Sequence, residues 1–162
     1  MLQLTEPATP DDWVLARRLI EEYSAGLGVD LCFQDIAREL RELERDYGPP
    51  AGALLLARVD GRLAGCVALR RFEPGIAELK RLYVLPVARG AGAGRALVEA
   101  MLARARALGY ARVRLDTLAT MQAAQALYRT LGFRPIAAYR VNPLAGAAYF
   151  ELDLSGDTHA ER

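Results

Sequence analysis

Histidine, serine and lysine are scarce in this chain of 162 residues, and each shortage excludes a kind of chemistry. The only histidine is His159, and the only serines, Ser24 and Ser155, lie outside any nucleophile-elbow sequence. A Ser-His-Asp triad and a histidine-based metal site are therefore excluded, and we expect no metal. Proton transfer must then be carried out by Asp, Glu, Tyr, Arg or the single lysine, Lys80.

Cysteines, long apolar runs and an excess of one charge are also lacking. The two cysteines, Cys32 and Cys66, have no CxxC spacing, no secretory signal opens the sequence, and no apolar run reaches transmembrane length. The 21 basic and 20 acidic residues nearly balance, which gives a formal net charge of +1. The composition predicts a cytoplasmic protein with no nucleic-acid or membrane partner.

The order of periodic segments predicts a single α/β domain over residues 1–154, followed by a flexible C-terminal tail over 155–162. A short strand comes first, then a helix capped by Thr9 and a second helix that ends at Gly48-Pro49-Pro50. Residues 51–84 are predicted to form an antiparallel meander of strands with turns at Asp60-Gly61 and Pro74-Gly75.

The second half of the chain contributes two more helices. One follows the glycines near residue 92 and stops at Gly109, and the other is capped by Thr120 and stops at Gly132. The whole order is β-α-α-β-β-β-α-β-α-β-β, a single domain with a mixed, mostly antiparallel seven-stranded sheet flanked by four helices. The sheet must be mixed because the meander runs into a βαβ crossover.

Three alternating glycines, Gly90, Gly92 and Gly94, stand where the third helix begins. Glycine inside a helix lowers its stability by roughly 1 kcal/mol relative to alanine, so three glycines at these positions suggest a requirement other than helix formation. A strand-to-helix turn without side chains exposes backbone N–H groups to an anion such as a phosphate. The dinucleotide fingerprint G-x-G-x-x-G/A fails at Arg95 or Leu97, and the P-loop pattern lacks its Lys-Ser/Thr, which disfavours a nucleotide-binding module.

The stretch R-G-x-G-x-G from Arg89 to Gly94, which follows Leu82-Tyr83-Val84, resembles the Q/R-x-x-G-x-G/A signature of the GNAT superfamily of acyl-CoA-dependent N-acetyltransferases. The later block QALYRTLGF resembles the same family, and the resemblance spans residues 2–154. It implies transfer of an acetyl group from acetyl-CoA, as cosubstrate, to a primary amine of a small molecule or peptide by direct attack. It also makes a homodimer possible. The alternative is a non-catalytic acyl-CoA-binding or regulatory module.

The resemblance also implies which residues hold acetyl-CoA. Backbone N–H groups of the glycine turn would bind the pyrophosphate, and the preceding strand would pair with the pantetheine arm in a gap between residues 77–84 and 111–117. The cofactor-binding residues are then Leu82, Tyr83, Val84, Arg89, Gly90, Ala91, Gly92, Ala93, Gly94 and Arg95. Met121 departs from the family pattern, in which many relatives have an asparagine that contacts the cofactor.

The resemblance also implies two catalytic residues, which occupy the positions of the family's catalytic residues in this sequence. Tyr128 matches the family's acid for the departing thiolate, against the alternative that it is one more core residue of its helix. Glu78 and Asp116 both match carboxylates that serve as base in different branches, with Glu78 slightly ahead; alternatively, each pairs with an arginine such as Arg81 or Arg114. For the acceptor side we expect Asp116, Tyr139 and Asn142, with Arg140 as a further polar candidate. The identity of the amine does not follow from the sequence.

Overall fold

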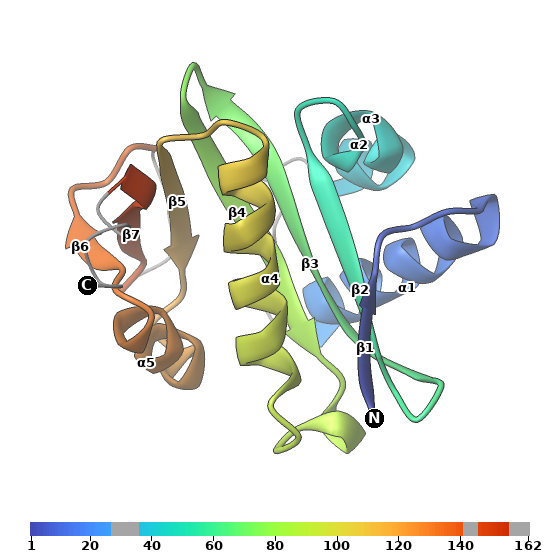
Figure 1. Cartoon of the computed structure of the whole chain (residues 1–162). Helices are drawn as coiled ribbons and strands as arrows, with labels where there is room; N and C mark the ends of the chain where they lie inside the picture. The colour runs from blue at the N-terminus through green and yellow to red at the C-terminus, as the bar shows by residue number, and fades with distance from the viewer. Residues whose placement is uncertain (27–35, 141–145, 156–162) are drawn as a thin grey trace.

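The computed structural model describes residues 1–26, 36–140 and 146–155, and these form one seven-stranded sheet (Figure 1). Its strand order is β1-β2-β3-β4-β5-β7-β6. Only β4 and β5 run parallel, so the predicted mixed and mostly antiparallel sheet is confirmed. The strands are β1 (Leu2–Thr5), β2 (Ala53–Val59), β3 (Arg62–Glu73), β4 (Ile76–Val84), β5 (Arg112–Thr117), β6 (Arg134–Ile136) and β7 (Ala148–Asp153).

The described residues form five α-helices where four were expected. The second expected helix is divided into two short ones, because the backbone of Glu42 leaves the helical range at φ −115° and ψ 29°. The helices are α1 (Pro10–Gly26), α2 (Ile36–Arg41), α3 (Leu43–Tyr47), α4 (Ala93–Ala107) and α5 (Gln122–Thr130), with a 3₁₀ turn, η2 (Pro86–Ala88).

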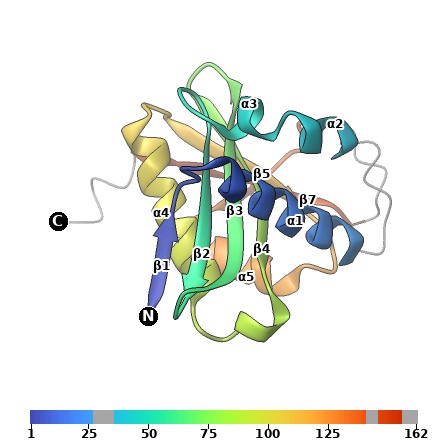
Figure 2. The ribbon, with the colours of Figure 1, turned by 90° about the vertical axis from the view of Figure 1, so that its right-hand side faces the viewer.

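The sheet is covered on both faces, because alternate residues of its central strands are apolar on both sides. On one face Leu55 and Val67 pack against α4, through residues such as Leu97. On the other face Leu56 and Cys66 pack against α1 and α3 (Figure 2). Cys66 is fully buried and packs there as a small apolar residue.

The turn and cap signals are confirmed with one exception. Thr9 Oγ1 accepts from the Asp12 N–H at 3.2 Å at the start of α1, and Gly109 ends α4 with φ +90°. Thr120, however, does not cap α5. The residue before that helix is Met121, whose side chain has no oxygen with which to cap it, and Met121 N–H closes a turn onto the Leu118 carbonyl.

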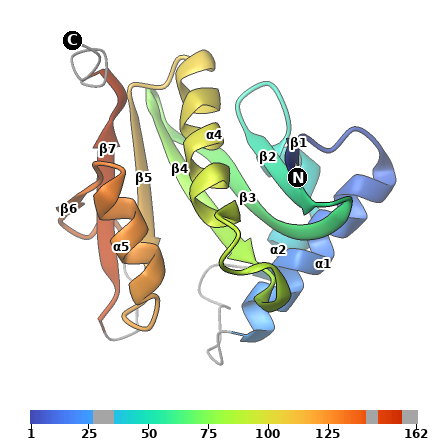
Figure 3. The ribbon, with the colours of Figure 1, turned by 60° about the horizontal axis from the view of Figure 1, so that its bottom comes forward.

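β4 and β5 pair over three residues and then separate, as the resemblance implied. Ile76–Glu78 pair with Arg112–Arg114, whereas β4 continues to Val84 with no further pairing to β5. Figure 3 shows the two strands diverging from the paired end. Arg81 forms a bulge against β3 and has φ +58°, a conformation that non-glycine residues rarely adopt. The separation leaves one edge of β4 open beside the glycine turn.

Candidate functional site

The glycine turn presents a run of backbone N–H groups with no backbone acceptor. Gly90 and Gly92 have φ +92° and +81°, so the backbone itself requires glycine there, and no atom lies within 4 Å of a Cβ built at either position. After Arg89, the next N–H in this turn that finds a backbone acceptor is that of Ala96, which donates to Gly92 O at 3.1 Å. The N–H groups of residues 90–95 and the helix dipole of α4 are therefore available to an anion, and anion binding there stays a prediction.

A groove of about 750 Å³ runs from this turn along the open edge of β4. One wall is formed by the turn and β4, and the opposite wall by the start of α5 and by Tyr23 of α1. Five predicted cofactor residues line it: Leu82, Tyr83, Val84, Arg89 and Gly94. Of the others, Gly90, Ala91, Gly92 and Arg95 lie exposed on the turn, and Ala93 is buried.

Two side chains fix the ends of the groove. Arg89 Nε donates to Val84 O at 3.1 Å, which ties the turn to the last residue of β4. Met121 lines the opposite wall, and its sulfur accepts a hydrogen bond from Thr117 Oγ1 at 3.4 Å. A thioether has no hydrogen to donate, so the Met121 side chain cannot donate a hydrogen bond to a ligand as an asparagine amide does.

A second cavity continues from the groove between β4 and β5. Tyr128, Lys80 and Asp116 line it together with Tyr23 and Met121, which also line the groove. Tyr128 is only 6% exposed, and its ring lies 5.5 Å from that of Phe133. Burial raises the pKa of Tyr128 well above its usual value, so the phenol keeps its proton at neutral pH.

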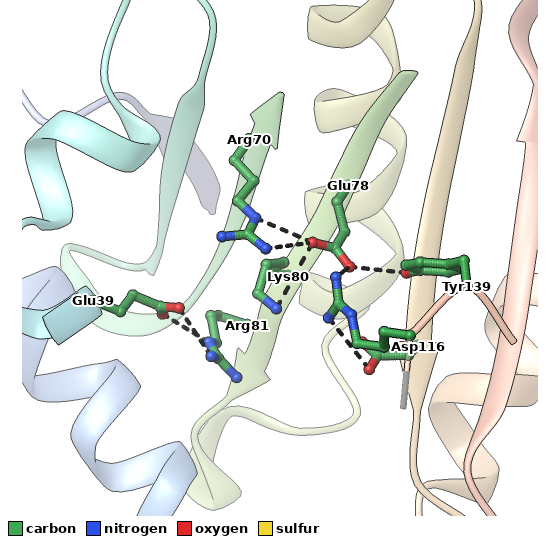
Figure 4. Close-up of polar contacts among 8 residues, drawn as sticks. Glu39, Arg70, Glu78, Lys80, Arg81, Asp116 and Tyr139 are labelled. Atoms are coloured by element: carbon green, nitrogen blue, oxygen red, sulfur yellow. Dashed lines mark hydrogen bonds and ion pairs between the residues drawn. The ribbon is translucent and has the colours of Figure 1, made fainter. Parts of the chain in front are cut away.

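Glu78 is fully buried on β4, two residues before Lys80 of the cavity lining, and is surrounded by cations (Figure 4). Its Oε1 accepts from Arg70 Nε at 3.1 Å, and its Oε2 accepts from the Tyr139 hydroxyl at 2.9 Å and also from Arg140. Lys80 Nζ lies 3.9 Å from Oε1, beyond hydrogen-bond distance. The resulting ion pairs bring β3, β4 and the segment after β6 together.

These neighbours decide the charge of Glu78. Burial alone would raise its pKa, but the charges of Lys80, Arg140 and Arg70 outweigh burial, and the pKa lies below its usual range. Glu78 is thus ionised at neutral pH, and both of its oxygens are occupied. A carboxylate in such surroundings is a weak proton acceptor, so its predicted role as the base stays a prediction that the geometry does not favour.

Asp116 lies on β5 two residues after Arg114, the strand partner of Glu78, and its carboxylate has fewer partners than that of Glu78. Its side chain is 8% exposed, and Oδ2 lies 3.5 Å from Arg140 Nη1 without a hydrogen bond. Tyr139 and Arg140 both come to the site, as expected for the acceptor side. Asn142 falls outside the residues that the structure describes.

The arginine partners differ from the sequence-based alternative. Arg81 does not pair with Glu78: its guanidinium binds Glu39 of α2 through two hydrogen bonds of 2.8 and 2.9 Å. Arg114 binds Glu151 at 2.6 Å. The Glu39–Arg81 pair had no local signal in the sequence, because its members lie on separate elements. Lys80 lies two residues after Glu78, so strand alternation puts both on one face of β4. The structure places Lys80 in the cavity lining, with its Nζ 3.9 Å from Glu78 Oε1.

No group of three or more potential metal ligands occurs among the described residues. Nor does any helix within residues 1–26, 36–140 or 146–155 have the length and apolar character needed to cross a membrane.

Comparison with known proteins places this site in a family. Residues 16–133 match the model of the acetyltransferase (GNAT) family. An uncharacterized N-acetyltransferase of Schizosaccharomyces pombe is 40% identical over 148 residues, which cover 90% of this chain and 91% of that protein.

Solved structures agree with this relationship. A GNAT-family acetyltransferase from Staphylococcus aureus Mu50 superposes with a TM-score of 0.78 at 19% identity, over 95% of this chain and 99% of that one. The structure of yncA from Salmonella typhimurium with its cofactor acetyl-CoA gives a TM-score of 0.66 at 20% identity, over 94% of each chain. The chain therefore belongs to the GNAT family of acetyltransferases.

Proposed function

We propose that the groove holds acetyl-CoA and that the cavity beyond it is where the acetyl group passes to a primary amine of a small molecule or peptide. One observation carries the proposal. The anion-binding N–H groups of residues 90–95, the open edge of β4, and Tyr128 with Asp116 follow one another along a continuous groove and cavity.

The groove fits acetyl-CoA by its chemistry. Backbone N–H groups at a helix N-terminus would bind the pyrophosphate, and the absence of side chains at Gly90 and Gly92 allows close approach. The edge of β4 from Leu82 to Val84 would pair with the amide-rich pantetheine arm as an added strand pairs with a sheet. Acetyl-CoA supplies the thioester, whose C–S bond breaks as the C–N bond to the amine forms.

The protein's own residues move the protons. Asp116 accepts the first proton of the acceptor's ammonium, because its Oδ2 has no hydrogen bond and its side chain belongs to the cavity lining. Tyr128 donates its phenolic proton to the sulfur as the thiolate leaves, and the second proton of the amine nitrogen restores the phenol. Glu78, the alternative base, holds Tyr139 and Arg140 in place. Overall, an ammonium and a thioester are converted to an amide, a thiol and one released proton.

A thermal-shift series with acetyl-CoA, CoA, NAD and ATP at equal concentration tests the binding part of the proposal. At a hundred times its dissociation constant, a ligand adds about 2.7 kcal/mol to the free energy of unfolding. For a domain of this size we expect a rise in Tm of roughly 5–10 °C with the CoA species alone. A larger shift with NAD or ATP would overturn the assignment of the groove.

Release of CoA thiol on addition of an amine tests catalysis separately. We expect thiol release that depends on both acetyl-CoA and the amine. Binding of acetyl-CoA without thiol release, across a broad amine panel, would instead favour the non-catalytic acyl-CoA-binding module.

A further inference from the structure

Lys80 is a buried ammonium that no hydrogen bond satisfies within the described residues. Its side chain is 5% exposed and it lines the cavity between β4 and β5. The one ion pair it makes there, to Glu78 Oε1, is 3.9 Å long. Closer donors already occupy that carboxylate, so three N–H bonds of Lys80 have no acceptor among the described residues. A buried charged group without hydrogen-bond partners lowers the stability of the fold, and a bound ligand can supply such partners.

The charges around the cavity leave one cation in excess. The arginine partners are assigned: Arg81 binds Glu39, and Arg70 and Arg140 bind Glu78. Four cationic side chains thus face three carboxylates, and the residual positive charge belongs to Lys80. The charged groups in its surroundings are Glu78 and Arg81 on β4, Asp116 on β5 and Arg70 on β3. A carboxylate placed beside Lys80 would supply the acceptors that its N–H bonds lack.

Asp116 supplies the complementary half of the site. It is a buried carboxylate with one oxygen that makes no hydrogen bond, and it lines the same cavity as Lys80. In the part of the chain that the structure describes, Lys80 and Asp116 form no ion pair with each other. One cavity therefore holds a separate acceptor for an ammonium and a separate donor for an anion (Figure 4).

We propose that the acceptor is an amine that also carries a carboxylate, as an amino acid does, with Asp116 receiving the amine and Lys80 binding the carboxylate. This inference rests on the proposed function and narrows its substrate class. Lys80 binds by charge and hydrogen bonding, so it selects the acceptor and takes no part in bond making.

Matched pairs of acceptors test the proposal. Each amino acid is compared with its own amide, which keeps the amine and replaces the carboxylate with a neutral group, and CoA thiol release is measured. We expect the wild-type protein to prefer the acid by at least tenfold in kcat/KM for its best acceptor. For Lys80→Met we expect KM for the acid to rise by one to two orders of magnitude, so that the preference disappears, while kcat/KM for the amide changes by less than about threefold.

Two variants serve as controls. Lys80→Arg keeps the positive charge and should retain part of the preference, whereas Arg71→Met removes an exposed cation from β3 and should leave the preference intact. The KM for acetyl-CoA and its thermal shift should be the same in all four proteins, which shows that each variant folds.

The possible outcomes are distinct. Equal turnover of acids and amides by the wild type would overturn the carboxylate site and leave the acetyltransferase proposal standing. A loss of kcat in Lys80→Met that is equal for acids and amides would also overturn it, since Lys80 would then act on the thioester. Thiol release with no amine, while acetyl-CoA still binds, would overturn the proposed function itself.

Discussion

Tyr128 shows how one residue serves both the core and the site. Its ring belongs to the apolar core beside Phe133 and Phe150, which is the alternative that the helix periodicity suggested. The same side chain lines the cavity that also contains Lys80 and Asp116. The two interpretations are therefore compatible: packing holds the phenol at the cavity, and its role as proton donor stays a proposal.

Removing the phenolic oxygen separates these two roles. We expect Tyr128→Phe to lower kcat by about 10²-fold or more, because the general acid is lost while the ring contacts stay. The free energy of unfolding should change little, since the phenol makes no hydrogen bond to any described residue. Steady-state kinetics with urea unfolding of the same preparation checks both statements. An unchanged kcat would return Tyr128 to a purely structural role.

At the scale of elements, the sequence predicted those features that depend on local signals. The Thr9 cap, the Asp60-Gly61 hairpin turn and the stop at Gly109 each depend on residues within a few positions of the chain, and each is confirmed. The break at Glu42 and the bulge at Arg81 could not be predicted in this way. The bulge turns the Arg81 side chain toward Glu39 of α2, a contact that only the assembled fold creates.

The features of the candidate site also differ in whether local sequence could predict them. Glycine spacing predicted a turn with free backbone N–H groups, because backbone conformation there is a local property. That the turn binds an anion stays a prediction. The three cations around Glu78 come from β3, β4 and the segment after β6, so their convergence depends on strand order. The same holds for the unsatisfied ammonium of Lys80, which periodicity could place on a face of β4 but not in a cavity.

Two glycines at the start of α4 should respond to alanine in opposite ways. Gly92 has φ +81°, so Gly92→Ala should lower the free energy of unfolding by about 1 kcal/mol. Gly94 lies inside the helix, and a Cβ there would meet Val84 Cγ2 at an ordinary 3.7 Å, so Gly94→Ala should be as stable as the wild type or more so. Because Gly94 lines the groove, this added methyl should weaken acetyl-CoA binding about tenfold.

Urea unfolding without ligand and calorimetric titration with acetyl-CoA check the pair. Gly61→Ala, in a distant turn with φ +80°, is the matched control and should lose stability without losing affinity. If Gly92→Ala unfolds at the wild-type urea concentration, left-handed strain is not what requires glycine at that position.

For the whole molecule, the buried charges couple stability to pH. Burial lowers the pKa of Lys80 from 10.5 to about 8, although Glu78 opposes the shift. Below pH 8 the ammonium is charged in the folded and unfolded states alike, so the folded state bears the full cost of burying it. Between pH 8 and 10.5 the unfolded chain binds more protons than the folded one, and the free energy of unfolding contributed by this group rises with pH.

This coupling predicts a pH-dependent difference between two proteins. At pH 7, the free energy of unfolding of Lys80→Met should exceed that of the wild type by roughly 1–3 kcal/mol. This difference should become smaller toward pH 10. Denaturant unfolding of both proteins across this range measures it, and the other titrating groups cancel in the difference. Parallel curves would show that the Lys80 ammonium is as well solvated in the fold as in the unfolded chain.

The short ladder between β4 and β5 has a mechanical consequence. Three paired residues on each strand, reinforced by the contacts of Glu78 with Tyr139 and Arg140, join a panel made of β1 to β4 to a panel made of β5 to β7. Resistance to twisting is greatest beside that hinge and falls toward the open end, where the groove lies. A molecule that hydrogen-bonds the free edge of β4 and packs against α5 would join the two parts of the sheet at their open end. While it is bound, it would restrict their relative motion.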